Sequence, residues 1–459
     1  MCEILPSVEP TLPDNENKNL AFAEHEETFS QVNLLDMPVE IILKILSHLE
    51  PAVLKNTISK VCKRFEDILA DDSLWKYWVH SKIKGCYPPL PDLKIYNEQE
   101  IDWGHVCVEI DIETKKWTNS EENFKHIIVK DVHYASVDTV LLVNGGETCI
   151  SGGRDRGIAV WNIKDLRMPE IPEKTNDDDI DFDLPPPTSI NVKPKHIIHD
   201  AHAGWVWDLA ADSLKNTTFV YSASWDNTVR AWDLNNGFEC IQTFRCGMSA
   251  LSVTTCENTV MAGLYSKKIL AFDLRSGPTP INWYKPHRGP VLALTCFNTM
   301  IASISEDKTL AIWDKTAGKL IKSDIKIPSE KSYPVCINWK PTAMYIGDSK
   351  GCLHLFNPEK LSFVKSHEIW PESSLIEPPN KIASCYQTEG NIIVCSDRGE
   401  IKFMHNSNPP QSYASIQTST VDVTQLRYFN NILVTGTCDS ALEFWIPIET
   451  YKNNLLTNN

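Results

Sequence analysis

The sequence predicts a multidomain protein in which a small all-α helical module precedes an all-β propeller of seven blades. Two observations predict it: apolar residues recur at helical spacing between residues 33 and 80, and strand-like segments repeat from residue 124 onward. A chain of 459 residues exceeds one small core unless a repeat spreads its length. The expected parts are a disordered acidic tail (1–32), the helical module (33–80), a partly helical linker (81–123), the propeller (124–446) and a C-terminal tail (447–459).

The first residues of the chain are rich in Glu, Asn and Pro and poor in periodic apolar positions, which is typical of a disordered tail. They contain neither a basic start nor an apolar run, so no secretory signal is expected. No apolar stretch reaches the roughly 20 residues that span a bilayer. The fourteen cysteines are scattered without a CxxC pair or a Cys/His cluster at metal-ligand spacing, which favours reduced thiols. We therefore expect a protein of the cytoplasm, the nucleus or both, without metal or cofactor.

The charge balance argues against two classes of partner. Lys and Arg total 44 against 60 Asp and Glu, which gives a formal net charge of −16. Such a field repels phosphate backbones and anionic membrane surfaces. The sequence therefore predicts neither a nucleic-acid-binding protein nor a membrane-binding one.

The helical module begins with the stretch LLDMPVEIILKILSHLEP. Its apolar residues form two adjacent columns of a helix: Ile41, Ile42, Ile45, Leu46 and Leu49. Pro38 suits the first helical turn, and Pro51 is expected to close the helix. Apolar residues resume at spacings of three and four from Leu54 to Leu69, and again from Leu74 to Trp78, so about three short helices are expected.

The linker permits two interpretations. Val106, Val108, Ile110 and Ile112 alternate as in a strand, whereas Trp103, Val106, Cys107 and Ile110 share one helical face. We favour the helix.

The propeller is predicted from a repeat whose strands end in an aromatic anchor. The seven anchors are Trp161, Trp232, Phe272, Trp313, Phe356, Phe403 and Trp445. All intervals but the first lie between 40 and 47 residues, near the roughly 40 to 45 residues of a four-stranded blade. Six positions before the anchors stand Asp155, Asp226, Asp307, Asp397 and Asp439, with Ser266 and Lys350 in the other two copies.

The first interval, 71 residues, is about thirty residues longer than the others and contains an acidic, proline-rich segment at residues 169–189. Thirty polar residues cannot build a four-stranded blade. We interpret the segment as a surface loop inserted into the propeller.

Both parts resemble known families. Residues 33–80 resemble an F-box through Pro38, Glu40, the run from Val61 to Phe65, and Leu74-Trp75, with Met37 where the family more often has leucine. Residues 124–446 resemble WD repeats. The WD resemblance implies that an N-terminal strand completes the last blade, and the alternating FKHIIVK (124–130) is suited to this because an unpaired edge invites aggregation.

The two resemblances together imply the substrate-recognition subunit of a Skp-cullin-F-box (SCF) ubiquitin ligase. Such a chain is not itself an enzyme: it docks on a Skp-type adaptor, through it on the cullin and RING subunits, and holds an unknown protein target. The implied adaptor-binding residues are Leu34, Leu35, Pro38, Ile42, Leu46, Val61, Cys62, Phe65 and Trp75. The alternative is a scaffold propeller that acts outside ubiquitin transfer.

His202, Ser222 or Ser224, and Asp226 also have the residue types of a nucleophilic triad, which would make the protein a hydrolase. The set recurs, however, with His133 and Asp155 and again with His287 and Asp307, whereas a catalytic site is normally built once. The resemblance implies instead a buried network of His, Ser or Thr, Asp and Trp in each blade. The blades with Ser266 and Lys350 must satisfy their turns otherwise, and we expect them to be less rigid.

Target binding is assigned to one face of the propeller. Trp205, Trp207, Trp225 and Tyr265 are placed there by the resemblance, and aromatic residues are enriched in binding hot spots. The alternative is that they pack between blades. Basic residues beside the turns are candidates to contact a phosphorylated peptide, although they form no cluster in the sequence: Arg154, Arg156, Lys308 and Arg398.

Overall fold

The structure is a computed structural model that describes residues 34–93, 101–167, 193–329, 331–370, 380–420 and 422–448. The chain divides into two compact units, residues 1–49 and residues 50–459. The predicted tail (1–32), the predicted insertion (169–189) and the predicted C-terminal tail beyond residue 448 lie outside the described residues.

The described part of the first unit, from residue 34 to residue 49, contains a 3₁₀ turn, η1 (Leu34–Asp36), and a helix, α1 (Val39–Leu46). Pro38 is the N-cap residue, and its carbonyl accepts hydrogen bonds from the amides of Ile41 and Ile42. Ile42 and Leu46 are buried, whereas Ile41 is 45% exposed. Pro51 does not end this helix: the chain leaves it at Ser47, and Pro51 begins the next helix, where its missing N–H costs nothing.

The second unit starts with short helices whose buried residues alternate with exposed ones. The elements are α2 (Pro51–Asn56), η2 (Ile58–Lys60), α3 (Lys63–Leu69) and α4 (Asp72–Lys82). Asp71 caps α4 by accepting the amide of Ser73 at 2.9 Å. The buried Trp75 donates its Nε1–H to the carbonyl of Leu69 at 2.8 Å, which joins α4 to the end of α3.

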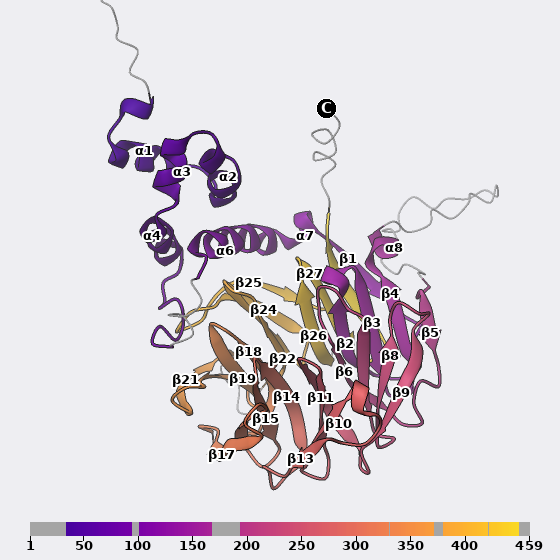
Figure 1. The fold of residues 1–459 in the computed structure, drawn as a ribbon. Helices are drawn as coiled ribbons and strands as arrows, with labels where there is room; N and C mark the ends of the chain where they lie inside the picture. Colours follow the sequence, from indigo (N-terminus) through magenta and orange to yellow (C-terminus); the bar gives the residue numbers. More distant parts are fainter. Residues whose placement is uncertain are drawn as a thin grey trace, which may run out of the picture. The chain divides into compact units, whose positions relative to one another are not determined.

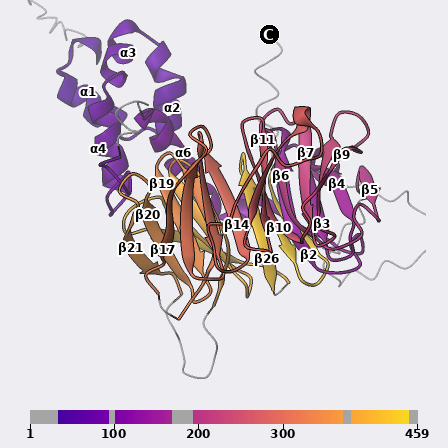
Figure 2. The same cartoon turned by 60° about the horizontal axis from the view of Figure 1, so that its bottom comes forward.

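The larger part of the second unit is the predicted propeller, which follows the linker. The described residues form seven four-stranded antiparallel sheets, and Figures 1 and 2 show them arranged around a common axis. Blade 1 is β2 (Val137–Val143), β3 (Thr148–Gly153), β4 (Ile158–Asn162) and β5 (His196–Ile198). Blade 2 is β6 (Val206–Ala211), β7 (Phe219–Ser224), β8 (Thr228–Asp233) and β9 (Glu239–Arg245). Blade 3 is β10 (Ala250–Cys256), β11 (Thr259–Leu264), β12 (Ile269–Asp273) and β13 (Asn282–Tyr284).

The next three blades repeat this order. Blade 4 is β14 (Val291–Phe297), β15 (Met300–Ser305), β16 (Thr309–Asp314) and β17 (Lys319–Lys326). Blade 5 is β18 (Pro334–Lys340), β19 (Ala343–Asp348), β20 (Cys352–Asn357) and β21 (Ser362–Glu368). Blade 6 is β22 (Ile382–Gln387), β23 (Asn391–Ser396), β24 (Glu400–His405) and β25 (Gln411–Gln417).

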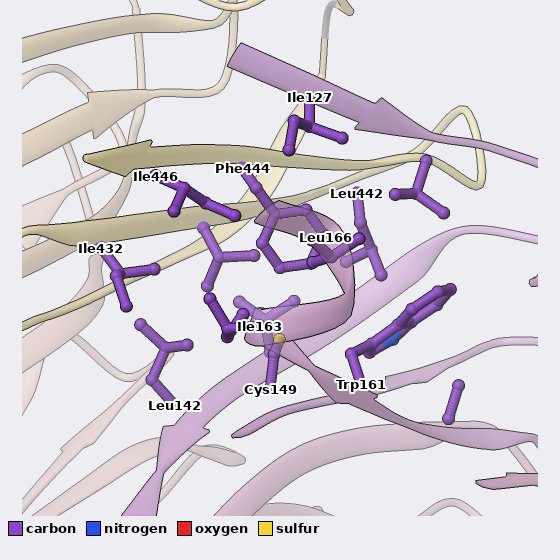
Figure 3. Close-up of a cluster of buried hydrophobic side chains, with 14 of the residues drawn as sticks. Ile127, Leu142, Cys149, Trp161, Ile163, Leu166, Ile432, Leu442, Phe444 and Ile446 are labelled. Carbon is purple, nitrogen blue, oxygen red and sulfur yellow. The ribbon is translucent and has the colours of Figure 1, made fainter. Parts of the chain in front are cut away.

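Blade 7 closes the ring by joining both ends of the repeat. It consists of β26 (Val423–Phe429), β27 (Ile432–Thr437) and β28 (Leu442–Pro447), with β1 (Phe124–Val129) as its fourth strand. β1 runs antiparallel to β28, with Ile127 opposite Phe444. Figure 3 shows Ile127 and Phe444 in a buried cluster with Leu142 and Trp161 of blade 1 and with Leu166 of the short helix α8 (Ile163–Arg167). The predicted pairing of FKHIIVK with the last blade is confirmed.

The propeller has two faces, which we name by their connections. The turn face carries the turns between the second and third strands of each blade, and the loops that enter each first strand lie beside these turns. A backbone hydrogen bond joins each turn to the loop beside it; in blades 1 to 3 these bonds are Arg154 N–H to Ser136 O, Trp225 N–H to Trp205 O, and Tyr265 N–H to Ser249 O. The linker face, at the opposite ends of the strands, carries the turns between first and second strands.

The linker contains the helix that we favoured, α6 (Trp103–Thr118), and not the strand that the alternating apolar residues also allowed. Asp102 caps it by accepting the amide of His105 at 2.8 Å, and Trp103, Val106, Cys107 and Ile110 are all buried. A second, one-turn helix, α7 (Ser120–Asn123), leads into β1. Together α6 and α7 lead directly into the first strand of the propeller.

α6 packs on the linker face of blades 6 and 7, and Figure 1 shows it beside β24 and β25. Glu109 Oε1 accepts the amide of Gly390 at 3.1 Å, in the turn between β22 and β23. Trp117 stacks between Phe124 of β1 and Phe403 of β24, with ring centroids 4.0 and 4.1 Å away. The linker face of these two blades is therefore covered by α6.

Candidate protein-interaction surfaces

Asp226 belongs to a buried hydrogen-bond chain that crosses blade 2. Its Oδ2 lies 2.8 Å from Nδ1 of His202, whose Nε2 lies 2.6 Å from Oγ of Ser222. The same Oγ accepts the indole N–H of Trp232 at 2.8 Å. With a neutral imidazole protonated at Nδ1, every donor in this chain meets an acceptor. The serine that belongs to the hydrogen-bond chain is thus Ser222. Ser224 instead accepts a hydrogen bond from the backbone amide of Asp226.

The electrostatics of this set fit a structural role. Burial acts to raise the pKa of Asp226, but hydrogen bonds from His202 and Thr228 outweigh it and hold the pKa far below its usual value. Burial lowers the pKa of His202 despite the opposing effect of Asp226, which keeps the imidazole neutral at pH 7. Ser222 is fully buried. A nucleophile must reach its substrate, so this geometry contradicts the hydrolase alternative for this set.

Other blades repeat or replace the chain. In blade 1, His133 bonds Asp155 at 2.9 Å and Ser151 at 2.8 Å, and in blade 4 His287 bonds Ser303 at 2.8 Å. Blade 5, which has Lys350 at the acid position, uses a different and equally buried set. Asp348 accepts from Ser332 at 2.6 Å and lies 3.2 Å from His354, and it also accepts the amide of Lys350. The expectation that this turn is satisfied otherwise is confirmed.

Four of the predicted target-binding residues meet on the turn face and form what we call the aromatic patch: Trp205, Trp207, Trp225 and Tyr265. The ring of Trp225 lies 5.6 Å from that of Trp205, 5.7 Å from that of Trp207 and 6.0 Å from that of Tyr265. Trp205 is 41% exposed, Trp225 38% and Tyr265 49%. The rings touch one another and also face solvent, so packing between blades does not account for them.

Arg154, from the β3–β4 turn of blade 1, joins the aromatic patch. Its guanidinium carbon lies 5.2 Å from the ring of Trp205 and 5.7 Å from that of Trp207. Its Nε donates to both carboxylate oxygens of Asp138, at 3.0 and 3.2 Å. Arg154 and Trp207 also line a central cavity of about 730 Å³, so the patch lies beside the opening of that cavity on the turn face.

The remaining predicted target-binding residues, Lys308 and Arg398, belong to the equivalent turns of blades 4 and 6 rather than to the three blades of the patch. Three exposed apolar residues of the turn face were not predicted from the sequence: Tyr134, Met248 and Tyr333. All three stand in loops that enter a first strand, as Trp205 does. Their position before a strand was available from the sequence, but a single exposed side chain has no periodic signal.

The predicted adaptor-binding residues of the first unit differ in exposure. Leu34 and Pro38 are exposed and Leu35 is half-buried, whereas Ile42 and Leu46 are buried in α1. The exposed apolar residues of α1 that the prediction left out are Val39, Ile41 and Ile45. The apolar column of α1 that contains Ile41 and Ile45 is therefore available to a partner, whereas the column that contains Ile42 and Leu46 is buried.

The predicted adaptor-binding residues of the second unit divide in the same way. Val61 is 63% exposed and Cys62 is half-buried, but Phe65 and Trp75 are buried within the helices. In this structure Phe65 and Trp75 therefore stabilise the packing of the helices and are not exposed to a partner. Tyr77, on α4, is exposed and was not predicted.

Comparison with known families agrees with both parts of the chain. A family model described as F-box-like matches residues 34–79, and one described as WD domain, G-beta repeat matches residues 193–233. The second match contains the entry loop of blade 2 and ends at Asp233, after the anchor Trp232. None of the helices within the described ranges combines the length and apolar character that crossing a bilayer requires.

Proteins whose names combine an F-box with WD repeats are similar to this chain over half of its length or more. F-box/WD repeat-containing protein 9 of Bos taurus is 25% identical over 421 residues, 91% of this chain and 83% of that protein. Its Homo sapiens counterpart is 25% identical over 427 residues, 92% of this chain and 84% of that protein. F-box/WD repeat-containing protein mec-15 of Caenorhabditis elegans is 28% identical over 244 residues, 51% of this chain and 54% of that protein. The chain thus combines an F-box-like region with a seven-bladed propeller that contains a WD repeat, which is the combination that the names of these relatives describe.

Proposed function

We propose that the chain is the substrate-recognition subunit of an SCF-type ubiquitin ligase. Its F-box docks on a Skp-type adaptor, which connects it to the cullin and RING subunits, and its propeller binds the protein to be ubiquitinated. The chain performs no bond chemistry: it acts in the cytoplasm, the nucleus or both by holding the target near the ubiquitin-loaded enzyme. A tether of suitable length raises the local concentration of the target to about millimolar.

One observation carries the proposal: the aromatic patch on the turn face is exposed in a chain that also carries an F-box-like region. α6 covers the linker face of blades 6 and 7, whereas the aromatic patch lies on the opposite face of the propeller, over blades 1 to 3. Trp and Tyr are the residues most enriched in binding hot spots, because they bury a large area at a small cost in conformational entropy. The patch therefore suits a protein segment.

Adaptor docking is supported by apolar surface on the F-box helices. In the first unit, Leu34, Ile41 and Ile45 each expose more than two fifths of their surface. In the second unit, Val61 and Tyr77 are exposed. A module of about fifty residues buries a thin core, and exposed apolar side chains on it are typically covered by a partner.

Substitutions in the two surfaces are expected to have separate effects, one on adaptor binding and the other on target capture. Leu35→Ala together with Pro38→Ala eliminates adaptor binding, because Leu35 in η1 and the N-cap residue Pro38 belong to the proposed docking surface, whereas Trp225→Ala leaves adaptor binding intact and reduces target capture. Lys44→Ala, an exposed change on the same helix, is the matched control. The measurement is co-precipitation of adaptor and cullin from cells, with comparison of ubiquitin-modified proteins in the presence and absence of residues 33–80.

Co-precipitation of the cullin complex by the double variant would contradict the docking surface. A wild-type chain that binds partners through Trp225 without any cullin complex would favour the alternative function, a scaffold outside ubiquitin transfer.

A further inference from the structure

The ring geometry of the aromatic patch restricts what it can bind. The rings of Trp205 and Trp207 are nearly parallel, at 17°, with centroids 6.4 Å apart. A group held between two parallel rings needs about 7 to 8 Å, twice the contact distance of about 3.5 to 4.0 Å. The rings therefore pack on one another and present a continuous surface rather than a cage that encloses a ligand.

A cation already occupies the edge of the aromatic patch. The guanidinium of Arg154 lies against the rings of Trp205 and Trp207 and is fixed by Asp138 through Nε. A basic side chain from a target would compete for the same ring faces and be repelled by Arg154. Cation–π capture of a lysine or arginine from the target is thus disfavoured here.

Arg154 keeps donors for a ligand. Among the described residues, the hydrogen bonds that its side chain donates all leave from Nε, and the side chain is 39% exposed. Its two Nη groups form a planar fork, the geometry that binds a carboxylate with two parallel hydrogen bonds.

The neighbouring turns make the surroundings of the aromatic patch basic. Arg156, Lys267 and Lys268 lie in the same turns as Arg154 and Tyr265. The acids of the turns in blades 1 and 2 are engaged internally, Asp155 by His133 and Asp226 by His202, while the exposed Asp200 lies 3.3 Å from Arg156. Lys267 and Lys268 add positive charge to the turn that carries Tyr265.

We propose that the target segment bound by this patch presents an apolar or aromatic side chain next to a carboxylate, with the apolar group on the Trp225 and Tyr265 rings and the carboxylate on the Arg154 fork. This inference rests on the proposed function, since it names the chemistry of the target. A carboxylate is favoured over a phosphate because Asp138 already balances the charge of Arg154 and Asp200 that of Arg156, so a dianion at the fork would meet little uncompensated positive charge.

The test begins with selection of a phage-displayed random dodecapeptide library on the full chain. Wild-type protein is expected to enrich Asp or Glu beside Trp, Phe, Leu or Met. Arg154→Gln is expected to lose the acidic preference and keep the apolar one, whereas Trp225→Ala is expected to lose both. Enrichment of Lys or Arg, or an acidic preference that survives Arg154→Gln, would overturn the proposal, as would recovery of no peptide that requires Trp225.

Affinities of a synthetic peptide from the wild-type selection then separate direct contact from a structural effect. Arg154→Gln weakens its binding about tenfold but leaves a Glu→Gln version of the peptide unaffected, and Asp138→Asn strengthens binding because it removes the internal competitor. Loss of binding in Asp138→Asn would contradict the proposal. A phosphoserine version that binds while the Glu version does not would replace it with phosphopeptide recognition.

The outcomes also distinguish this proposal from the proposed function. Adaptor co-precipitation and target ubiquitination that depend on Trp225, with no acidic preference in the selected peptides, would leave the receptor role standing and refute only the target chemistry. Target capture that is indifferent to Trp225 would remove the aromatic patch from both.

Discussion

Asp226 accepts hydrogen bonds from His202, from the hydroxyl of Thr228 at 2.6 Å and from the amide of Ala203 at 3.1 Å. Its carboxylate thus connects the loop that enters blade 2 to the turn between β7 and β8. Because both segments lie under the aromatic patch, this acid supports the surface that carries Trp205 and Trp225 without being part of it.

We predict that Asp226→Ala destabilises the protein by about 1 to 3 kcal/mol, since it removes the carboxylate that accepts from Nδ1 of the buried His202. The measurement is the melting temperature in thermal denaturation. Asp439→Ala changes the exposed acid at the same position of blade 7 and is the matched control, with an expected effect within about 0.5 kcal/mol. An unchanged melting temperature for Asp226→Ala would refute the structural assignment.

The residue types of the blade network were predictable from the sequence, but some partners were not. Ser222 and Ser224 are two positions apart on one strand and share a face, so alternation could not choose between them. Blade 5 replaces the set with Ser332, Asp348 and His354, whose spacing differs from that of the other blades. Such a substitution depends on which side chains meet in three dimensions, which no local pattern records.

α6 carries an acid that its sequence pattern did not single out. Glu113 is buried between the helix and blades 6 and 7, where it accepts from Asn391 at 2.7 Å and from Tyr428 at 3.0 Å. The residues that surround Glu113, Asn391 and Tyr428, lie about 280 and 315 positions away in the sequence. The sequence therefore showed the helical period of the linker but not the environment of Glu113.

Burial, reinforced by the nearby Glu109, raises the pKa of Glu113 to about 8. The folded state therefore keeps a proton that the unfolded state releases above its ordinary pKa of about 4.5. Stability contributed at this site is fully present below pH 4.5 and is lost as the pH rises toward 8.

We predict that Glu113→Gln raises the melting temperature at pH 8 and has little effect at pH 4.5, because glutamine replaces the protonated acid and can keep both hydrogen bonds. Thermal denaturation across this pH range measures it. Glu121→Gln, on the exposed helix α7, is the control and should leave the pH profile unchanged. A Glu113→Gln variant that is less stable at pH 8 would contradict the assignment.

The whole molecule depends on the joint between blade 7 and blade 1. Ile127 is fully buried in the cluster that spans the two blades, and its strand supplies the outer edge of blade 7. The number of blades was predictable because the repeat period is a local signal, and the closing strand because the WD resemblance implies one and residues 124–130 alternate as a strand does. The exposure of the F-box residues was not, since Phe65 and Trp75 had the same apolar character as Val61.

We predict that Ile127→Asp opens the ring, because an unpaired charge replaces a fully buried side chain at the joint, at a cost of several kcal/mol. The expected result is a sharply lowered melting temperature and aggregation in size-exclusion chromatography. Lys125→Gln, a half-exposed change on the same strand, should remain monodisperse. A monodisperse Ile127→Asp protein with a wild-type melting temperature would show that closure does not depend on β1.

The pairing of β1 with β28 also sets an order of events during synthesis. Val129 meets Leu442, which the ribosome adds about 300 residues later. At about 5 to 20 residues per second, the nascent chain carries β1 without its neighbour for tens of seconds. The helices that precede β1 leave the ribosome before the ring exists. A message truncated ahead of Leu442 yields a chain in which β1 has no strand to pair with.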